Sequence, residues 1–326
     1  MKRFCKKIVI LLLPLVLYYA AFIMMDPFNY FDLSFKETFL SSTEPLPKMR
    51  QVMRGNIQNV LLGDSRTSHF DTDYLYEITG DQYYNLGFGG ASLKEEIDLF
   101  WWAAKYNKLE KVVLQTGFWT VNKGYAGDRI PSLQSVAENP IRILLNWSCH
   151  KASWKHLKTI YSKSGGPLVY TDEERAENLR YYAEEIIYPV AAKYETDWDD
   201  IEALRDIGQY CEENGITFIV IFPPLDQSIW DIVITPLGLY EEMELAKKTI
   251  SEFAVVYDME YPEMDAYSQG DYVDGFHMNG MQDGVDYGAD DFVEKYPALT
   301  DYLDQMYNGK TEHMHIWRDG KIVAGE

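Results

Sequence analysis

The stretch "NVLLGDSRTSHF", from Asn59 to Phe70, decides how the fold of this 326-residue chain is interpreted. A short apolar run ends in Gly63, Asp64 and Ser65, and a polar segment follows. An apolar run of this length before a turn signal is typical of a buried strand. Ser65 is therefore either a turn residue or a nucleophile at the end of a strand, and the rest of the sequence must decide between them.

Similar apolar runs recur along the chain, and helical patterns separate most of them. Ser92-Leu-Lys-Glu95 and Thr171-Asp-Glu-Glu174 have the form of capping boxes, which open helices. This alternation predicts an α/β fold, a three-layer αβα sandwich around a parallel, flavodoxin-like sheet. The predicted strands are Asn59–Leu62, Tyr83–Leu86, Lys111–Gln115, Ile216–Phe222 and Phe253–Asp258; later helices are expected at Asp197–Asn214, from Pro236, and at Asp290–Met306.

The composition excludes several classes of partner and cofactor. The net charge of −21, from 30 basic and 51 acidic residues, repels phosphate backbones and argues against nucleic acid as a partner. Three scattered cysteines supply neither a disulfide framework nor a zinc site. His313 and His315 in "HMHIW" lack nameable further ligands and are interpreted as structural. No metal and no cofactor are predicted.

The N-terminus carries a membrane signal. Four basic residues precede an uncharged apolar run, Ile8–Met25, which as a helix is about 27 Å long against a hydrocarbon core of about 30 Å. No small-x-small cleavage pattern follows, so residues 1–26 are interpreted as a basic cytoplasmic flank and a transmembrane signal anchor, with a cleaved signal peptide as the alternative. The prediction is a single-pass plasma (inner) membrane protein whose remaining residues lie outside the cytoplasm.

Two later segments complete the domain organisation. Residues 27–55, with their Ser-Ser-Thr-Glu-Pro-Leu-Pro stretch, are interpreted as a tether, and residues 56–326 as the main domain. Residues 122–197 form a helical insertion after the third strand, longer than one crossover needs. This insertion is either a cap packed on the core or a lid or docking face for a second protein.

Three polar sites are expected at one edge of the sheet, since ligands bind beyond the carboxyl ends of parallel strands. Ser65 follows the first strand, and the glycine-rich loop Asn85–Ser92 follows the second. Asp274 and His277 follow the fifth strand, at a spacing that lets the carboxylate orient the imidazole. A serine, a histidine and an aspartate thus meet in one predicted pocket.

These residues resemble the conserved blocks of the SGNH/GDSL hydrolase superfamily. Gly63-Asp64-Ser65-Arg66 is similar to the first block, Asn85–Gly90 to the glycine block, and Asp274-Gly-Phe-His277 to the terminal Asp-x-x-His. The blocks occur in the family's order between Val60 and Asn279. With the N-terminal anchor, the layout resembles the extracytoplasmic partners of membrane-bound O-acyltransferases, which acylate polysaccharides or teichoic acids.

The resemblance implies a catalytic triad in an SGNH hydrolase-like fold. Ser65 would attack an ester carbonyl, His277 would remove its proton, and Asp274 would hold the imidazole tautomer. The backbone N–H groups of Ser65 and Gly90 would meet the oxyanion, with Gly89 beside them. Asp64 would order the loop, and Arg66 would either bind a substrate carboxylate or phosphate or lie in solvent.

The chain departs from the family at the third block. The family places an asparagine in the oxyanion hole as Gly-x-Asn-Asp, whereas this chain has "LQTGFWTVN", with Phe118 near the expected place. Candidate replacements are the Trp119 indole, the Thr120 hydroxyl or a backbone N–H. Asn122 lies too far along the chain.

Three function classes follow. The first is a cell-envelope O-acyltransferase that passes an acyl group, expected to be acetyl, through an acyl-serine to a surface glycan, with a membrane-bound O-acyltransferase as partner. The second is a surface carbohydrate esterase with the same triad. The third is a non-catalytic, membrane-anchored scaffold of an envelope assembly.

Overall fold

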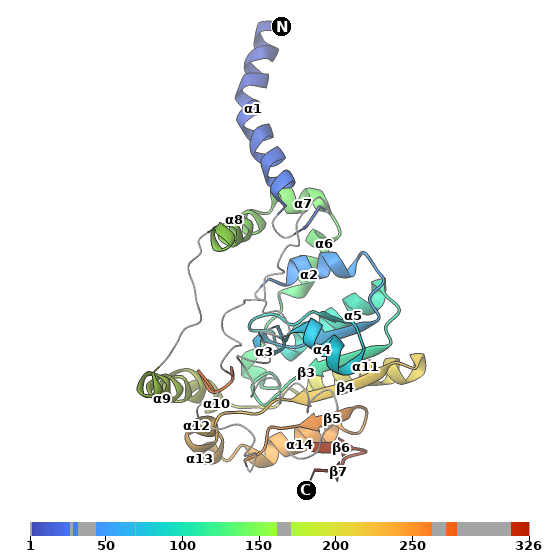
Figure 1. Cartoon of the computed structure of the whole chain (residues 1–326), viewed down its shortest axis with the longest axis vertical. Coiled ribbons are helices and arrows are strands. Elements are labelled where there is room, and N and C mark those ends of the chain that lie inside the picture. The colour runs from blue at the N-terminus through green and yellow to red at the C-terminus, as the bar shows by residue number, and fades with distance from the viewer. Residues whose placement is uncertain are drawn as a thin grey trace.

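A seven-stranded mixed sheet forms the centre of the computed structural model, which describes residues 2–26, 29–31, 44–68, 70–161, 171–262, 272–278 and 314–325 (Figure 1). The strand order is β2-β1-β3-β4-β5-β6-β7. The strands are β1 (Asn59–Leu62), β2 (Tyr83–Asn85), β3 (Lys111–Gln115), β4 (Thr217–Phe222), β5 (Val255–Asp258), β6 (His315–Arg318) and β7 (Lys321–Ala324).

The first five strands lie where the sequence predicts them, within two residues at each end. All of their pairings are parallel, and the order 2-1-3-4-5 is that of flavodoxin-like doubly wound sheets. In such a sheet the ligand crevice opens where the strand order reverses, here between β1 and β3. Ser65 directly follows β1 and therefore lies at this switch point.

The prediction of an all-parallel sheet is wrong at one edge. β6 pairs antiparallel with β5, and β7 pairs antiparallel with β6. The turn between them, Arg318-Asp-Gly-Lys321, has positive φ at Asp319 (50°) and Gly320 (71°), the conformation of a tight hairpin turn. A two-residue turn cannot connect parallel strands, so β7 runs antiparallel to β6, while the antiparallel pairing of β6 with β5 makes the sheet mixed.

Successive strand residues point to opposite faces of the sheet, and both faces are buried. Val60 and Leu62 belong to one core, together with residues of α5 and α11, whereas Leu61 belongs to a second core with Tyr74 and Leu75 of α4. The helices of the first part of the chain are α1 (Lys2–Met25), α2 (Pro45–Val52), α3 (Ser65–Ser68), α4 (Thr72–Thr79) and α5 (Leu93–Tyr106).

The later helices fall in the insertion and between the last parallel strands. The helix predicted from Pro236 is interrupted, because Gly238 adopts a left-handed conformation (φ 67°) and ends α13 before α14 starts. The predicted helix Asp290–Met306 lies outside the described residues. The elements are η1 (Lys123–Tyr125), α6 (Ile130–Ala137), α7 (Pro140–Leu145), α8 (Trp147–Tyr161), α9 (Asp172–Tyr181), η2 (Tyr182–Ile187), α10 (Tyr188–Ala191), α11 (Trp198–Asn214), α12 (Gln227–Ile229), η3 (Trp230–Ile234), α13 (Thr235–Leu237) and α14 (Tyr240–Ile250).

The two ends of the insertion lie side by side. Asn122 forms a bridge with Thr196, and the N–H of Asp197 donates to the carbonyl of Val121 (2.8 Å). Between these ends, helices α6 to α8 lie toward α1, whereas α9 and α10 lie at the opposite end of the molecule (Figure 1). The insertion therefore presents two separate groups of helices.

Part of the predicted tether belongs to the core. Helix α2 begins at Pro45, and Leu46, Met49 and Val52 are buried against α5 and the sheet. Proline in the first turn of a helix costs no hydrogen bond, so the Pro-Leu-Pro sequence starts this helix instead of forming a linker. Interpreting all of residues 27–55 as a tether is therefore wrong for α2.

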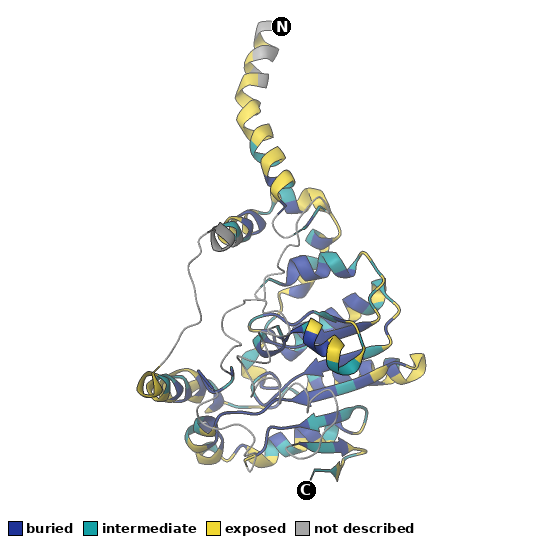
Figure 2. Cartoon of the chain, in the orientation of Figure 1, coloured by how far each residue is buried: buried dark blue, intermediate teal, exposed yellow. Residues whose placement is uncertain are grey.

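Helix α1 projects from one end of the molecule, and most of its described residues are exposed (Figures 1 and 2). Its exposed apolar side chains include Ile10, Leu11 and Leu17. Among the helices that the structure describes, none is both long and apolar enough to cross a membrane. The transmembrane segment predicted from the sequence stays a prediction.

The two predicted capping boxes differ in burial, which gives a matched test. Ser92 is buried; its Oγ accepts from the Glu95 N–H and donates to the carbonyl of Gly127 (3.0 Å), whereas the cap at Thr171 is exposed. We expect Ser92→Ala to lower the free energy of unfolding by about 2 kcal/mol and Thr171→Ala by about 0.5–1 kcal/mol, because only the first removes a buried cap and leaves the half-buried Gly127 carbonyl without its donor. Urea unfolding measures both, and equal losses would contradict this assignment.

Candidate active site

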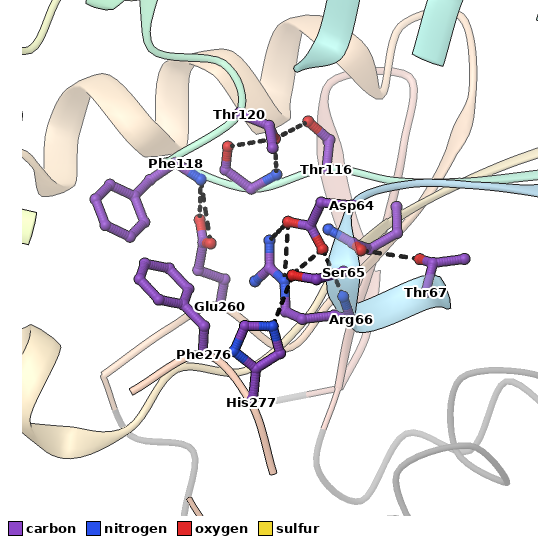
Figure 3. A network of polar contacts seen from close by, with 12 residues as sticks. Asp64, Ser65, Arg66, Thr67, Thr116, Phe118, Thr120, Glu260, Phe276 and His277 are labelled. Atoms are coloured by element: carbon purple, nitrogen blue, oxygen red, sulfur yellow. Dashed lines mark hydrogen bonds and ion pairs between the residues drawn. The ribbon is translucent and has the colours of Figure 1, made fainter. Parts of the chain in front are cut away.

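The structure brings Ser65, His277 and Asp274 together in one hydrogen-bonded chain, and Figure 3 shows the contact between Ser65 and His277. The Oγ of Ser65 lies 2.6 Å from Nε2 of His277, and Nδ1 of His277 lies 2.7 Å from Oδ2 of Asp274. Ser65 and His277 are 212 residues apart in the sequence. With the Nδ1 proton held by Asp274, Nε2 is free to accept the proton of the serine hydroxyl.

The segment that carries the histidine is folded around Asp274. Oδ1 of Asp274 accepts from the backbone N–H groups of Phe276 (3.1 Å) and His277 (2.8 Å), which form a tight turn at Gly275 (φ 85°). Burial would raise the pKa of Asp274, but the hydrogen bond from His277 and the two N–H groups outweigh it and lower this pKa below its usual value. The carboxylate is thus ionised at neutral pH and can hold the imidazole.

Parts of the chain on both sides hold this turn. The N–H of Asp226, after β4, donates to the carbonyl of Gly275 (3.0 Å). Asn178 of α9 donates through its amide to the carbonyl of Val273. The second group of insertion helices therefore contacts the segment that carries Asp274 and His277.

The glycine-rich loop after β2 packs directly against the serine segment. The N–H of Phe88 donates to the carbonyl of Gly63 (3.1 Å), and Nδ2 of Asn85 donates to the carbonyl of Thr67 (2.7 Å). A Cβ at Gly87 would lie 2.8 Å from the backbone nitrogen of Ser68, so only glycine permits this approach. The loop and the segment that carries Ser65 are therefore fixed relative to each other.

Two cations that the sequence analysis did not single out hold the carbonyls of this loop. Lys48 of α2 is buried and donates to the carbonyl of Gly87, and burial lowers the pKa of Lys48 to about 7. Nη2 of Arg129 donates to the carbonyl of Gly90 (2.6 Å), and Nη1 reaches that of Gly89 (3.4 Å). The carbonyls of Gly89 and Gly90 are thus hydrogen-bonded, whereas their backbone N–H groups have no acceptor among the described residues.

Arg66 lies in the interior instead of in solvent. It is 2% exposed, and its Nη2 donates to Oδ2 of Asp64 at 2.8 Å. The amide of Gln115, oriented by its neighbours, accepts from Arg66 Nη2 and donates to Asp64 Oδ1, both at 2.9 Å. Burial would raise the pKa of Asp64, but the charge and hydrogen bonds of Arg66 lower it. The ion pair of Asp64 and Arg66 therefore lies buried directly next to Ser65 in the sequence.

Glu260, just after β5, joins the same buried cluster, and no sequence pattern predicts this role. Both of its carboxylate oxygens lie 3.1 Å from the backbone nitrogen of Phe118. A Cβ at Gly117, two residues after β3, would lie 2.8 Å from Glu260 Oε2 and 3.4 Å from Arg66 Nη2, so a larger residue there would displace this carboxyl group. Burial raises the pKa of Glu260 to about 8, although Lys247 and Arg66 oppose this effect.

The third-block positions have other partners in this structure. The Thr120 hydroxyl is buried within its own turn, 2.8 Å from the hydroxyl of Thr116, and the N–H of Phe118 is taken by Glu260. Oδ1 of Asn122 accepts from the N–H of Gly124 (3.0 Å) within the insertion. Of the replacements considered, the Trp119 indole and a backbone N–H other than that of Phe118 remain.

Tyr125 of η1, which the sequence analysis did not single out, lies beside this indole. The rings of Trp119 and Tyr125 are 5.1 Å apart. That hydroxyl lies 3.3 Å from where a Cβ on Gly90 would be. Burial raises the pKa of Tyr125, with the charge of Asp64 adding to the effect. The Tyr125 hydroxyl is therefore protonated and lies close to Gly90 of the glycine-rich loop.

The other histidines lie away from Ser65 or outside the described residues. His150 is buried in α8, and His315 of β6 stacks on Tyr261 with ring centres 4.0 Å apart. His69 and His313 lie outside the described residues. Within the part of the chain that the structure describes, no group of histidine, cysteine and acidic side chains is placed to hold a metal ion.

Comparisons with known proteins add a weak structural likeness. No protein-family model matches the chain, and no curated protein matches it. A crystal structure from Bacteroides fragilis NCTC 9343, described in its own name as a "putative acylhydrolase", is similar at a TM-score of 0.36 and 13% identity, covering 77% of this chain and 86% of that one. A likeness of this size carries no argument, so the interpretation of the site rests on its geometry.

The buried carboxyl of Glu260 predicts a pH dependence of stability. Its pKa of about 8 in the folded chain lies above the ordinary value of 4.5, so the unfolded chain loses this proton first as pH rises. The stabilising contribution is present below pH 4.5 and is lost as pH rises toward about 8. Glu260→Gln keeps an acceptor for the Phe118 N–H but cannot ionise. We therefore expect the unfolding free energy of the wild type, relative to that of Glu260→Gln, to fall as pH rises from 4.5 to about 8.

Urea unfolding at several pH values measures that difference. Glu202→Gln, at an exposed position of α11, is the control and should keep the wild-type dependence. A Glu260→Gln variant that follows the wild-type profile throughout would mean that the carboxyl is ionised in the folded chain.

Proposed function

We propose that this chain is a serine-dependent enzyme of the SGNH type that acts on carboxylic esters, by hydrolysis or by acyl transfer. The observation that carries the proposal is the hydrogen-bonded chain from Ser65 through His277 to Asp274, at 2.6 Å and 2.7 Å. A serine hydroxyl is a weak nucleophile unless a base lies within hydrogen-bond reach, and here Nε2 is at that distance. The chain thus has the parts that acyl-enzyme chemistry needs.

The mechanism follows from these atoms. Ser65 Oγ forms a bond to the ester carbonyl carbon while its proton passes to Nε2 of His277. Asp274 stabilises the imidazolium through Nδ1–H and does not itself take the proton. The tetrahedral intermediate collapses as His277 returns the proton to the leaving alcohol, which leaves an acyl group on Ser65. A water molecule or an acceptor hydroxyl, deprotonated by His277, then releases the acyl group.

The oxyanion is assigned to backbone donors at the switch point. The N–H groups of Ser65 and Gly90 have no acceptor among the described residues, and the first lies at the N-terminal end of α3. We assign the third donor to the Tyr125 hydroxyl, which lies near Gly90 on a ring that packs on Trp119. It would replace the asparagine side chain that the family supplies at this place.

Transfer to a glycan is the finer proposal. The exposed apolar helix α1 and the insertion supply surfaces that a soluble esterase does not need. We therefore favour an extracytoplasmic enzyme that takes an acyl group from a membrane-bound O-acyltransferase and passes it to a surface polysaccharide. A glycan that gains the acyl group supports transfer, whereas release of only the free acid supports the surface esterase.

Labelling by a fluorophosphonate tests the nucleophile. We expect the wild-type chain to be labelled, Ser65→Ala to lose all labelling, and His277→Ala to lose most of it. Because triad members act as a unit, Ser65→Ala should lower ester turnover at least about 10⁴-fold, and the double variant little further. Asp274→Asn should fold but favour the wrong imidazole tautomer, giving a comparable or smaller loss.

Ser68→Ala is the matched control for this experiment. Ser68 ends the same short helix, but its hydroxyl donates to the carbonyl of Ser65 (2.7 Å) and has no assigned part in the chemistry. Labelling that persists in Ser65→Ala and disappears in Ser68→Ala would mean that Ser68, and not Ser65, is the nucleophile. A folded wild-type chain that never labels would favour the non-catalytic scaffold.

Removal of one hydroxyl tests the third donor. Tyr125→Phe keeps the ring that packs on Trp119 and should lower turnover of an aryl ester at least about 10-fold, mainly in kcat, because the donor acts on the developing oxyanion. Tyr106→Phe, which removes a surface hydroxyl bonded to Glu138 (3.0 Å), is the control and should keep wild-type turnover. Equal turnover in both variants would remove Tyr125 from the oxyanion site.

A further inference from the structure

The first helices of the insertion expose an apolar and basic face beside α1. Ile141 is 64% exposed, Leu145 73%, Trp147 65% and Trp154 44%. Trp147, Lys151, Trp154 and Lys155 recur at the spacing of one helix face and line a cavity of about 260 Å³ on α8. We call these six residues, Ile141, Leu145, Trp147, Lys151, Trp154 and Lys155, the α7–α8 face.

This face is joined to the lower part of α1. The hydroxyl of Tyr18 lies 3.0 Å from Nδ1 of His150, whose Nε2 lies 2.8 Å from the carbonyl of Leu144. Nε1 of Trp154 reaches the same hydroxyl at 3.4 Å, and the rings of Phe22 and His150 are 4.1 Å apart. Helix α1 and the α7–α8 face therefore form one continuous surface at the upper end of the molecule in Figure 2.

The length of α1 sets how deep this surface can lie. The part of α1 before these contacts, Lys2 to Leu17, rises only about 24 Å, and its apolar portion from Ile8 only about 15 Å. The hydrocarbon core of a bilayer is about 30 Å thick. This portion is shorter than the core is thick, so an α1 that contacts lipid through its exposed apolar side chains, without spanning the bilayer, brings the α7–α8 face to the same lipid surface.

The chemistry of the face suits an anionic lipid surface. Tryptophan side chains are enriched at the headgroup level of membranes, and lysines there reach anionic phosphates with their apolar stems in the interface. Lys151 and Lys155 stand on this face, although the chain as a whole has a net charge of −21. Glu44 is an acidic neighbour of this face: burial raises the pKa of its carboxyl, and the charge of Lys155 opposes that effect. A largely acidic chain thus presents its aromatic and basic helix face at the end where α1 emerges.

We propose that the α7–α8 face lies in the headgroup layer of an anionic bilayer and, together with α1, forms the membrane-binding surface of the protein. This inference deepens the proposed extracytoplasmic location at the membrane and does not depend on the ester chemistry. In this proposal the first group of insertion helices, α6 to α8, contacts lipid, whereas α9 of the second group contacts the segment that carries Asp274 and His277.

Quenching of tryptophan fluorescence by brominated lipids tests this placement. The full-length chain is reconstituted into phosphatidylcholine vesicles with and without phosphatidylglycerol, using lipids brominated near the headgroup. Two of the eight tryptophans of the chain lie on the face, so we expect about a quarter of the emission to be quenched, and the Trp147→Phe/Trp154→Phe variant should lower the quenched fraction at least about twofold. Trp198→Phe, which removes a tryptophan of similar exposure (41%) on α11, is the control and should leave the quenched fraction unchanged.

The charge of the face is tested in the same vesicles. Lys151→Glu/Lys155→Glu should lower the quenching in vesicles that contain phosphatidylglycerol, and added salt should do the same to the wild type. In phosphatidylcholine alone the charge variant and the wild type should be alike.

Three results would overturn the proposal. If the chain floats with vesicles but the double tryptophan variant is quenched like the wild type, α1 alone contacts lipid. If the chain does not float at all, the membrane location fails, whatever the fluorophosphonate labelling shows. If the face variants change association with cell membranes but not with lipid vesicles, a protein covers the face instead of lipid.

Discussion

The burial of the Arg66 guanidinium is the constraint on which the candidate site depends. A guanidinium stays charged in proteins, so its place beneath the nucleophile requires partners at every strand end around it. Asp64 supplies the ion pair from the end of β1, and Gln115 supplies an amide from β3. Glu260 adds a carboxyl after β5 and holds the N–H of Phe118. One buried charge thus fixes the ends of three strands around Ser65.

Much of the fold could be predicted from sequence because its signals are local. The five parallel strands are short apolar runs, and Ser92 and Thr171 open helices through capping boxes that depend on four consecutive residues. Asp274 and His277 could be paired because they are only three positions apart in the sequence. Their meeting with Ser65 could be predicted only through the rule that parallel strands end at one edge of the sheet.

Other features depend on contacts between distant residues. Nothing near Glu260 indicates that it binds Phe118, 142 residues away, and Arg66 in a polar stretch gives no sign of its burial. Tyr125 acquires its place beside Gly90 only after the insertion folds. The β6–β7 hairpin is different, because its Asp-Gly turn is a local signal in the sequence. The prediction for "HMHIW" rested on its two histidines alone and did not include this hairpin.

The central claim is that the hydrogen bond from Ser65 to His277 makes this serine an acyl acceptor. The most direct measurement mixes the full-length chain with p-nitrophenyl acetate, quenches the mixture in acid before deacylation, and maps the acetyl group by peptide mass spectrometry. The account predicts an acetyl group on Ser65 that is absent from His277→Ala. Release of p-nitrophenol with the acetyl group on another side chain, or with no acyl-enzyme at any quench time, would contradict it.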